Sequence, residues 1–189
     1  MSLETIDRPT RTARPAAPLP DLLPREVWRS MLLTGPRAGE IDTLTGLCSR
    51  RGLRRRIAEA IDQAARHEET GAVIFCELDA LEALVARHGK EAGAAALRHA
   101  AEAIRGAVRD IDAIGRIGGG SFAVLLARVP VDQALAIAAR ISTGVRARRL
   151  PWRDLALPIA VSVGIAAFSG TEDADALLAR AAGPAPGAA

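Results

Sequence analysis

The stretch that decides the fold is DAIGRIGGGSFAVLLA, residues 112–127. Two short apolar runs flank consecutive glycines, and this arrangement predicts two antiparallel strands joined by a tight turn. Glycine readily adopts the positive φ angles that such turns require, so Gly118, Gly119 and Gly120 suit the turn whatever else they do. By itself, a run of glycines identifies no family of proteins.

Hydrophobic residues on both sides of this hairpin recur with the spacing of helices or of buried strands. The pattern predicts an α/β (α+β) domain in which helices cover a sheet that contains antiparallel strands. The run that ends at Phe168 contains Pro158, so it forms either one strand or two. The expected helices cover 53–69, 91–109, 131–147 and 171–182, and the expected strands outside the hairpin cover 71–79 and 155–168.

The chain of 189 residues is long enough for one domain with short extensions. Residues 1–23 are rich in proline and arginine and are predicted to form a flexible tail. Residues 24–40 are predicted to form a short helix and a linker, because Pro24 suits the first position of a helix. The domain itself is expected over 41–182, followed by a second flexible tail at 183–189.

The composition limits the classes of function that we expect. Lys and Arg number 25 against 22 acidic residues, and a net charge of +3 gives no reason to expect bulk nucleic-acid binding. Cys48 and Cys76 lack CxxC spacing, which argues against a zinc site or a disulfide framework. No segment reads as a membrane span or a secretion signal, so we expect a cytoplasmic protein with no membrane insertion.

Three motifs, in this order, provide a resemblance to a known family. The stretch DTLTGLCSRRGL (42–53) is similar to D-x-L-T-G-L-x-N-R-R, RIGGGSFAVLL (116–126) to R-x-G-G-D/E-E-F, and SVGIA (162–166) to S-x-G-x-A. In these motifs the chain resembles the GGDEF domains of diguanylate cyclases. The resemblance implies the palm-like fold of nucleotide cyclases, with a central, mostly antiparallel sheet flanked by helices.

Diguanylate cyclases join two GTP molecules, and this chemistry needs a divalent metal held by carboxylates close to the triphosphate. In the family these carboxylates come from the first acid of a D-x-D strand end and from the third position of the hairpin. Here the strand end offers Glu77 and Asp79, the third hairpin position is Gly120, and Ser121 replaces the next glutamate. The resemblance therefore predicts no catalytic residue, no bound metal and no required cofactor, with Glu77 and Asp79 as the remnant candidates for a metal.

The residues that recognise GTP in the family also differ here. Val85 and Ala94 stand where the family has its guanine-binding Asn and Asp, and Glu82 replaces a lysine on the phosphate side. Near the end of the chain, Ala182 stands at the Asp of the family's A-D-x-A-L-Y-x-A-K motif. We therefore expect a pseudoenzyme. The alternative is a residual cyclase that makes cyclic di-GMP from GTP with the two acids that remain at the strand end.

A second site of the family, R-x-x-D, binds the product cyclic di-GMP and lies five residues before the first hairpin glycine. RDID (109–112) has this offset, and Arg140 occupies the position of an arginine that usually completes the site. The resemblance thus predicts that Arg109, Asp112 and Arg140 bind cyclic di-GMP. An arginine can donate two hydrogen bonds to guanine O6 and N7, and a carboxylate can accept from the N1–H and N2–H₂ edge. The alternative is that Arg109 is only a solvated arginine at a helix end.

Two classes of function remain open. The first is a catalytically inactive receptor for cyclic di-GMP. The second is an interaction scaffold that binds no nucleotide and recruits a protein partner through residues 1–40. Because members of the family work as dimers, the resemblance also implies a homodimer.

Overall fold

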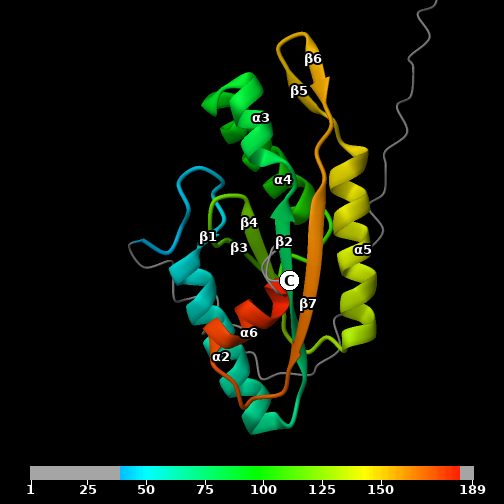
Figure 1. Cartoon of the computed structure of the whole chain (residues 1–189). Helices are drawn as coiled ribbons and strands as arrows, with labels where there is room; N and C mark the ends of the chain where they lie inside the picture. Colours follow the sequence, from blue (N-terminus) through cyan, green and yellow to red (C-terminus); the bar gives the residue numbers. More distant parts are fainter. Residues whose placement is uncertain (1–38, 184–189) are drawn as a thin grey trace, which may run out of the picture. The chain divides into compact units, whose positions relative to one another are not determined.

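The structure is a computed structural model, and it describes residues 39–183 (Figure 1). The tail predicted at 1–23, the helix predicted near Pro24 and the tail after Gly183 lie outside the described residues. The elements in chain order are β1 (Cys48–Ser49), α2 (Arg50–His67), β2 (Gly71–Leu78), α3 (Leu81–His88), α4 (Lys90–Arg105), β3 (Ala113–Arg116), β4 (Ser121–Leu126), α5 (Val131–Ala147), β5 (Leu150–Trp152), β6 (Leu155–Leu157), β7 (Val161–Phe168) and α6 (Ala174–Ala182).

The central sheet has five strands in the order β1-β3-β4-β2-β7. The pair β1–β3 is parallel, whereas β3–β4, β4–β2 and β2–β7 are antiparallel, so the predicted, mostly antiparallel sheet is confirmed. The predicted hairpin consists of β3 and β4, paired from Ala113 with Leu125 to Arg116 with Phe122. Strands β5 and β6 form a separate two-stranded sheet at the upper end of the view in Figure 1.

Side chains that alternate along the strands enter two hydrophobic cores on opposite faces of the sheet. On β2, Ala72, Ile74 and Cys76 join the core under α4 and α5, whereas Val73 joins the core with α2 and α6. Burial raises the pKa of the Cys76 thiol to about 12, which makes this cysteine an unreactive core residue. Because helices cover both faces, functional groups are placed at the ends of the strands and on the connecting turns.

Helix α2 begins where the first motif ends. The Ser49 hydroxyl accepts a hydrogen bond from the N–H of Gly52 at 3.2 Å and donates one to the carbonyl oxygen of Gly39 at 2.7 Å. Serine is a good N-cap, so Ser49 in place of the family's asparagine leaves the helix start intact. Buried Glu40 pairs with Arg55 of α2 at 2.9 Å and ties the segment before β1 to this helix.

Several elements differ from the sequence prediction. The helix expected over 91–109 ends at Arg105, so the R-x-x-D residues lie on the turn after it. The run 155–168 forms two strands, the second of the two alternatives, and they lie in different sheets. The last helix, expected from 171, begins at Ala174 after its N-cap Asp173. The sequence pattern predicts neither α3 nor β1 nor the β5–β6 hairpin. These elements are too short to show a periodic apolar pattern, and α3 has no buried residue.

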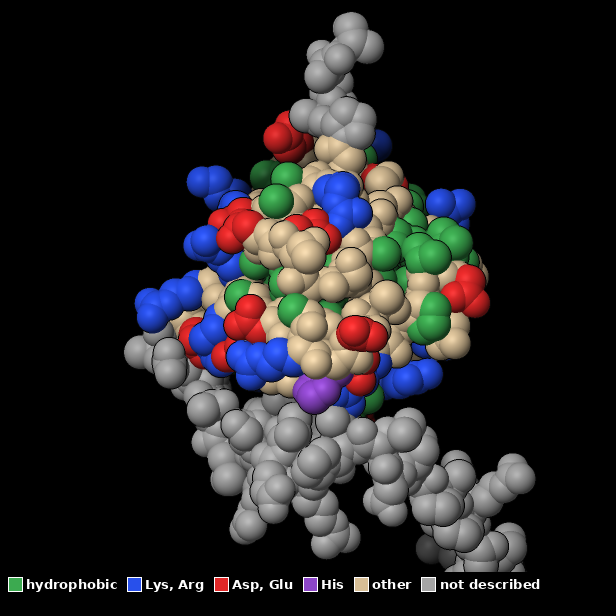
Figure 2. Space-filling view, turned by 90° about the horizontal axis from the view of Figure 1, so that it is seen from below, with side chains coloured by type: hydrophobic (Ala, Val, Ile, Leu, Met, Phe, Trp, Pro, Cys, Tyr) green, Lys and Arg blue, Asp and Glu red, His purple; other side chains and the backbone are tan. Residues whose placement is uncertain are grey.

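The described surface mixes charges of both signs with a small apolar area. In Figure 2, hydrophobic side chains gather over the N-terminal end of α5, where Val131 is 51% and Leu135 58% exposed. Within residues 39–183, no helix combines the length and the hydrophobicity needed to cross a lipid bilayer.

Candidate functional site

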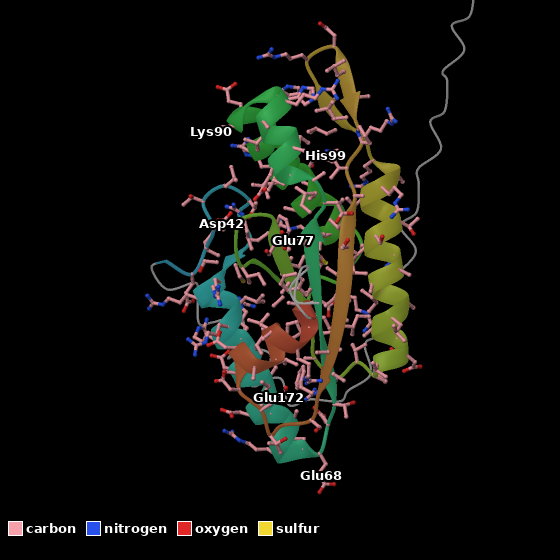
Figure 3. The ribbon with its side chains drawn as sticks, in the orientation of Figure 1. Asp42, Glu68, Glu77, Lys90, His99 and Glu172 are labelled. Atoms are coloured by element: carbon pink, nitrogen blue, oxygen red, sulfur yellow. The ribbon has the colours of Figure 1, made fainter. Side chains whose placement is uncertain are left out.

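The turn of the β3–β4 hairpin is held by Arg116. Its guanidinium donates from Nη2 to the carbonyl oxygen of Gly119 at 2.8 Å and from Nη1 to Asp42 Oδ2 at 3.2 Å. Asp42 Oδ1 accepts from the N–H and the hydroxyl of Thr45 at 2.9 and 2.7 Å. Burial acts to raise the pKa of Asp42, but the bonds from Thr45 and the charge of Arg116 outweigh it and lower the pKa. The first two motifs therefore meet through Asp42, which Figure 3 labels.

Glu77, labelled in Figure 3, lies near the end of β2, directly across from Ser121 of β4. The Ser121 hydroxyl donates a hydrogen bond to Glu77 Oε2 at 2.5 Å. A Cβ atom at Gly120 would lie 3.0 Å from Glu77 Oε1 and 3.2 Å from Leu81 Cδ2. The third hairpin position thus adjoins the strand-end acid, but glycine supplies no metal ligand there.

Asp79 makes contacts that hold strands together. Its Oδ1 accepts from the N–H and the hydroxyl of Ser162 at 3.1 and 2.8 Å, which ties the end of β2 to the start of β7. Across residues 39–183, no three His, Cys, Asp or Glu side chains are grouped so that they could hold a metal ion. A hard divalent cation takes several oxygen ligands, often from more than one carboxylate. The donor set therefore does not fit the metal that the family's reaction requires.

The position of the guanine-binding asparagine is filled by a packing contact between helices. A Cβ atom at Gly93 of α4 would lie 2.5 Å from Val85 Cγ2, so the half-buried Val85 rests directly on α4. Ala94 is also half-buried, and Glu82 is exposed on α3. Neither Val85 nor Ala94 has a polar side-chain atom, so these positions offer no hydrogen bond to a guanine.

The turn after α4 brings Arg109 and Asp112 together. Asp112 Oδ2 accepts from the N–H of Arg109 at 2.9 Å, and the N–H of Asp112 donates to the carbonyl oxygen of Arg109 at 3.0 Å. Arg140 reaches across from α5 and donates from Nε to the carbonyl oxygen of Ala107 at 2.7 Å. The structure therefore gathers Arg109, Asp112 and Arg140, the three residues singled out from the sequence, around one turn.

The electrostatics of this turn centre on Asp112. Partial burial raises the pKa of its carboxyl, and the hydrogen bond from the Arg109 N–H and the charges of Arg109 and Arg140 offset only part of that rise. An acid whose pKa is raised by folding destabilises the fold while it is charged. The Asp112 carboxylate is thus partly shielded from water, but it accepts too few hydrogen bonds to compensate for the lost hydration. The N–H groups of a ligand can donate the missing hydrogen bonds.

We expect Asp112→Asn to increase the free energy of unfolding at pH 7 by a small amount, under about 1 kcal/mol. The amide oxygen still accepts from the Arg109 N–H, and a buried negative charge is removed. The gain should fall as the pH drops below the raised pKa of the folded state and disappear at about pH 2.5, where Asp112 is protonated in both the folded and the unfolded state. Urea denaturation at both pH values measures the effect, with the exposed Asp110→Asn as the control. A loss of stability of equal size at both pH values would contradict this role of the charge.

The structural roles of Asp42, Arg116 and Ser162 are not apparent from the sequence alone. All three residues lie in the three sequence motifs, and this location is the one feature of the sequence that could have indicated a structural role. Their contacts join segments far apart in the chain, and the sheet register that creates those contacts is not visible in the motifs.

Comparison with known proteins finds a matching family and similar sequences. The model of the family described as "Diguanylate cyclase, GGDEF domain" matches residues 40–183. The chain is 38% identical over 133 residues to the bifunctional diguanylate cyclase/cyclic di-GMP phosphodiesterase MucR of Pseudomonas aeruginosa, covering 68% of this chain and 19% of MucR. It is 33% identical over 138 residues to the diguanylate cyclase TpbB of the same species, covering 72% of this chain and 32% of TpbB. The chain therefore spans well under half the length of these relatives.

Solved structures agree with this placement. Diguanylate cyclase SiaD, in complex with its activator SiaC from P. aeruginosa, superposes with a TM-score of 0.75 at 26% identity over 84% of this chain and 61% of that chain. The GGDEF domain of P. aeruginosa TpbB gives 0.68 at 33% identity over 73% and 81%. A microbial GGDEF domain solved for its interaction with cyclic di-GMP gives 0.64 at 26% identity over 76% and 88%.

Proposed function

The chain belongs to the GGDEF family of diguanylate cyclase domains, and from this premise we propose that it is a catalytically inactive member that binds cyclic di-GMP as a receptor. The observation that carries the proposal is the meeting of Arg109, Asp112 and Arg140 at the turn after α4. The contacts at the hairpin support the inactive state, and the solved GGDEF domain that interacts with cyclic di-GMP supports the choice of ligand.

The loss of catalysis follows from the groups at the hairpin and the end of β2. Glu77 accepts from Ser121, Asp79 accepts from Ser162, and Gly120 has no side chain. Phosphoryl transfer depends on metal ions that neutralise the charge developing on the phosphate, and each missing ligand weakens that stabilisation. No step of GTP condensation can be assigned to these side chains.

The recognition of cyclic di-GMP follows from the chemistry of the turn. Within residues 39–183, the guanidinium of Arg109 forms no hydrogen bond and no ion pair. Its N–H groups are therefore available to donate to guanine O6 and N7. One Asp112 oxygen is used by the Arg109 N–H, which leaves the second to accept from a guanine N–H edge. Arg140 adds a positive charge for a ligand that carries two phosphates.

A receptor role follows from the position of the turn between two helices. A ligand that binds Arg109 and Asp112 on the turn after α4, and also Arg140 on α5, would connect this turn to α5. Such a bridge can stabilise one arrangement of the surrounding surface and so alter contact with a protein partner or a second copy of the chain.

Calorimetric titration of the full chain with cyclic di-GMP tests the proposal. We expect micromolar or tighter binding. Arg109→Ala should bind about 5- to 150-fold more weakly, because one bidentate guanine contact contributes about 1–3 kcal/mol. Arg87→Ala is the matched control, since Arg87 is an exposed arginine of α3 and should bind like the wild type.

Two results would overturn the proposal. Absence of binding at any accessible concentration would favour the scaffold that acts through residues 1–40, and deletion of those residues should then abolish complex formation. Formation of cyclic di-GMP from GTP with magnesium or manganese would instead establish a residual cyclase.

A further inference from the structure

Arg148 lies at the C-terminal end of α5, and its backbone is fixed against α4. The Nε2–H of His99, labelled in Figure 3, donates to the carbonyl oxygen of Arg148 at 3.1 Å. Leu150 then enters the core with 4% exposure. The guanidinium extends toward the end of α4, where its Nη2 lies 3.5 Å from the place that a Cβ atom at Gly106 would occupy. The backbone of Arg148 is therefore held beside α4, and its guanidinium lies near the C-terminal end of that helix.

Arg140 and Arg148 converge on the same turn. Arg140 lies within α5, and Arg148 is the extended residue that follows the last turn of this helix. Between them is Gly144, where a Cβ atom would meet nothing within 4 Å, so the space is open. Arg140 reaches Ala107 and Arg148 reaches Gly106, and these two residues are adjacent in the chain.

Neither guanidinium group is in an ion pair with a carboxylate of the described residues, although the charge of Arg140 acts on nearby Asp112. Within residues 39–183, the arginines that form ion pairs are Arg54, Arg55, Arg116, Arg128 and Arg180. The partial negative charge at the end of α4 attracts Arg140 and Arg148. Arg140 uses only its Nε for Ala107, so its remaining N–H groups are free. Convergent arginines repel one another, and a bound anion removes that repulsion.

We infer that Arg148 is a further binding residue of the same site, and that with Arg140 it holds a phosphate of cyclic di-GMP. The inference rests on the proposed function, because it assigns one more contact to that ligand. Arg109 and Asp112 present the donors and the acceptor that a guanine edge needs. Arg140 and Arg148 present the forked donors that suit a phosphate, whose oxygens accept two parallel N–H bonds from a guanidinium.

Titration of the full chain with cyclic di-GMP at about 50 mM and about 300 mM NaCl tests the inference. We expect Arg148→Ala to weaken binding about tenfold or more at low salt, the effect of one lost hydrogen bond between charged groups. The affinity of the wild type should also fall more steeply with salt than that of the variant. Arg148→Lys should recover part of the affinity, since it keeps the charge without the fork. The control is Arg146→Ala, an exposed arginine on another side of α5.

The outcomes separate this inference from the proposed function. If the wild type does not bind, both are overturned. If Arg109→Ala loses binding while Arg148→Ala keeps the affinity and the salt dependence of the wild type, only the inference about Arg148 is overturned. A lower melting temperature of Arg148→Ala with unchanged affinity also overturns it, because Arg148 would then serve only to stabilise the end of α4.

Discussion

Gly164→Ala should lower the free energy of unfolding by about 2–3 kcal/mol, and Gly164→Val by more. A Cβ atom at Gly164 would lie 2.1 Å from the carbonyl oxygen of Ala181, so the last turn of α6 must move away from β7. Gly164 is not among the glycines with positive φ, and alanine in a strand is normally more favourable than glycine. A loss of stability therefore isolates the steric contact. Urea denaturation followed by circular dichroism measures it.

Gly119→Ala is the matched control for this substitution. A Cβ atom at Gly119 would meet nothing within 4 Å, and Gly119 is exposed on the hairpin turn. Its stability should stay within about 0.5 kcal/mol of the wild type. If the Gly164→Ala variant were as stable as the Gly119→Ala variant, the close approach of α6 to β7 at Gly164 would be contradicted.

These contacts give the family's motifs a structural role that does not depend on any reaction. Asp42 and Arg116 fix the hairpin turn, Ser162 joins β7 to Asp79, and Gly164 admits α6. Each of these motif residues holds two segments together, and each is needed even if no GTP binds. Under the proposed function, Gly120 stands in place of the family's metal-binding acid, and this replacement leaves the sheet intact.

The sequence predicted those parts of the fold whose apolar pattern is long. Helix α5 extends over Val131–Ala147, the same range that periodicity predicts, because five of its residues are buried at regular spacing. Helix α3 gave no such signal, since none of its residues is buried and Ala80, its N-cap, has a φ of 53° and no side-chain cap. The β5–β6 turn contains Arg153 at a φ of 52°, a position where glycine or asparagine would have marked a turn.

Of the candidate site, the sequence predicted only the residues that occupy positions of a family motif. Motif spacing groups Arg109 with Asp112. The apolar pattern continues through Val108 although α4 ends at Arg105, so the sequence places Arg109 at the end of a helix and Asp112 at the start of the hairpin, not on one turn. Arg148 belongs to no motif. Its position depends on the contact between His99 and its own backbone, which only the packing of α4 on α5 creates.

Gly120→Asp should make the thermal stability of the protein depend on a divalent metal. The new carboxylate would adjoin Glu77, whose Oε1 lies 3.0 Å from the Cβ position, and two such charges repel by about 2–4 kcal/mol at an effective dielectric constant near 20. With EDTA we expect the melting temperature to fall by about 5–10 °C. Millimolar Mn²⁺ should restore most of this loss, because it binds the folded state and offsets the repulsion. The wild type should shift by less than about 1 °C, and differential scanning calorimetry with and without Mn²⁺ measures both.

Gly120→Asn separates charge from size in this experiment. It crowds Leu81, 3.2 Å from the Cβ position, as much as aspartate does, but it adds no charge beside Glu77. Its loss of stability should be smaller than that of Gly120→Asp and should not respond to Mn²⁺. A wild type that Mn²⁺ stabilised as strongly as the Gly120→Asp variant would show that Glu77 and Asp79 hold the cation without a third acid. The metal would then have to displace the hydrogen bonds that Ser121 and Ser162 donate to these two acids. Such a result would contradict the proposal that the chain is catalytically inactive and would favour a residual cyclase.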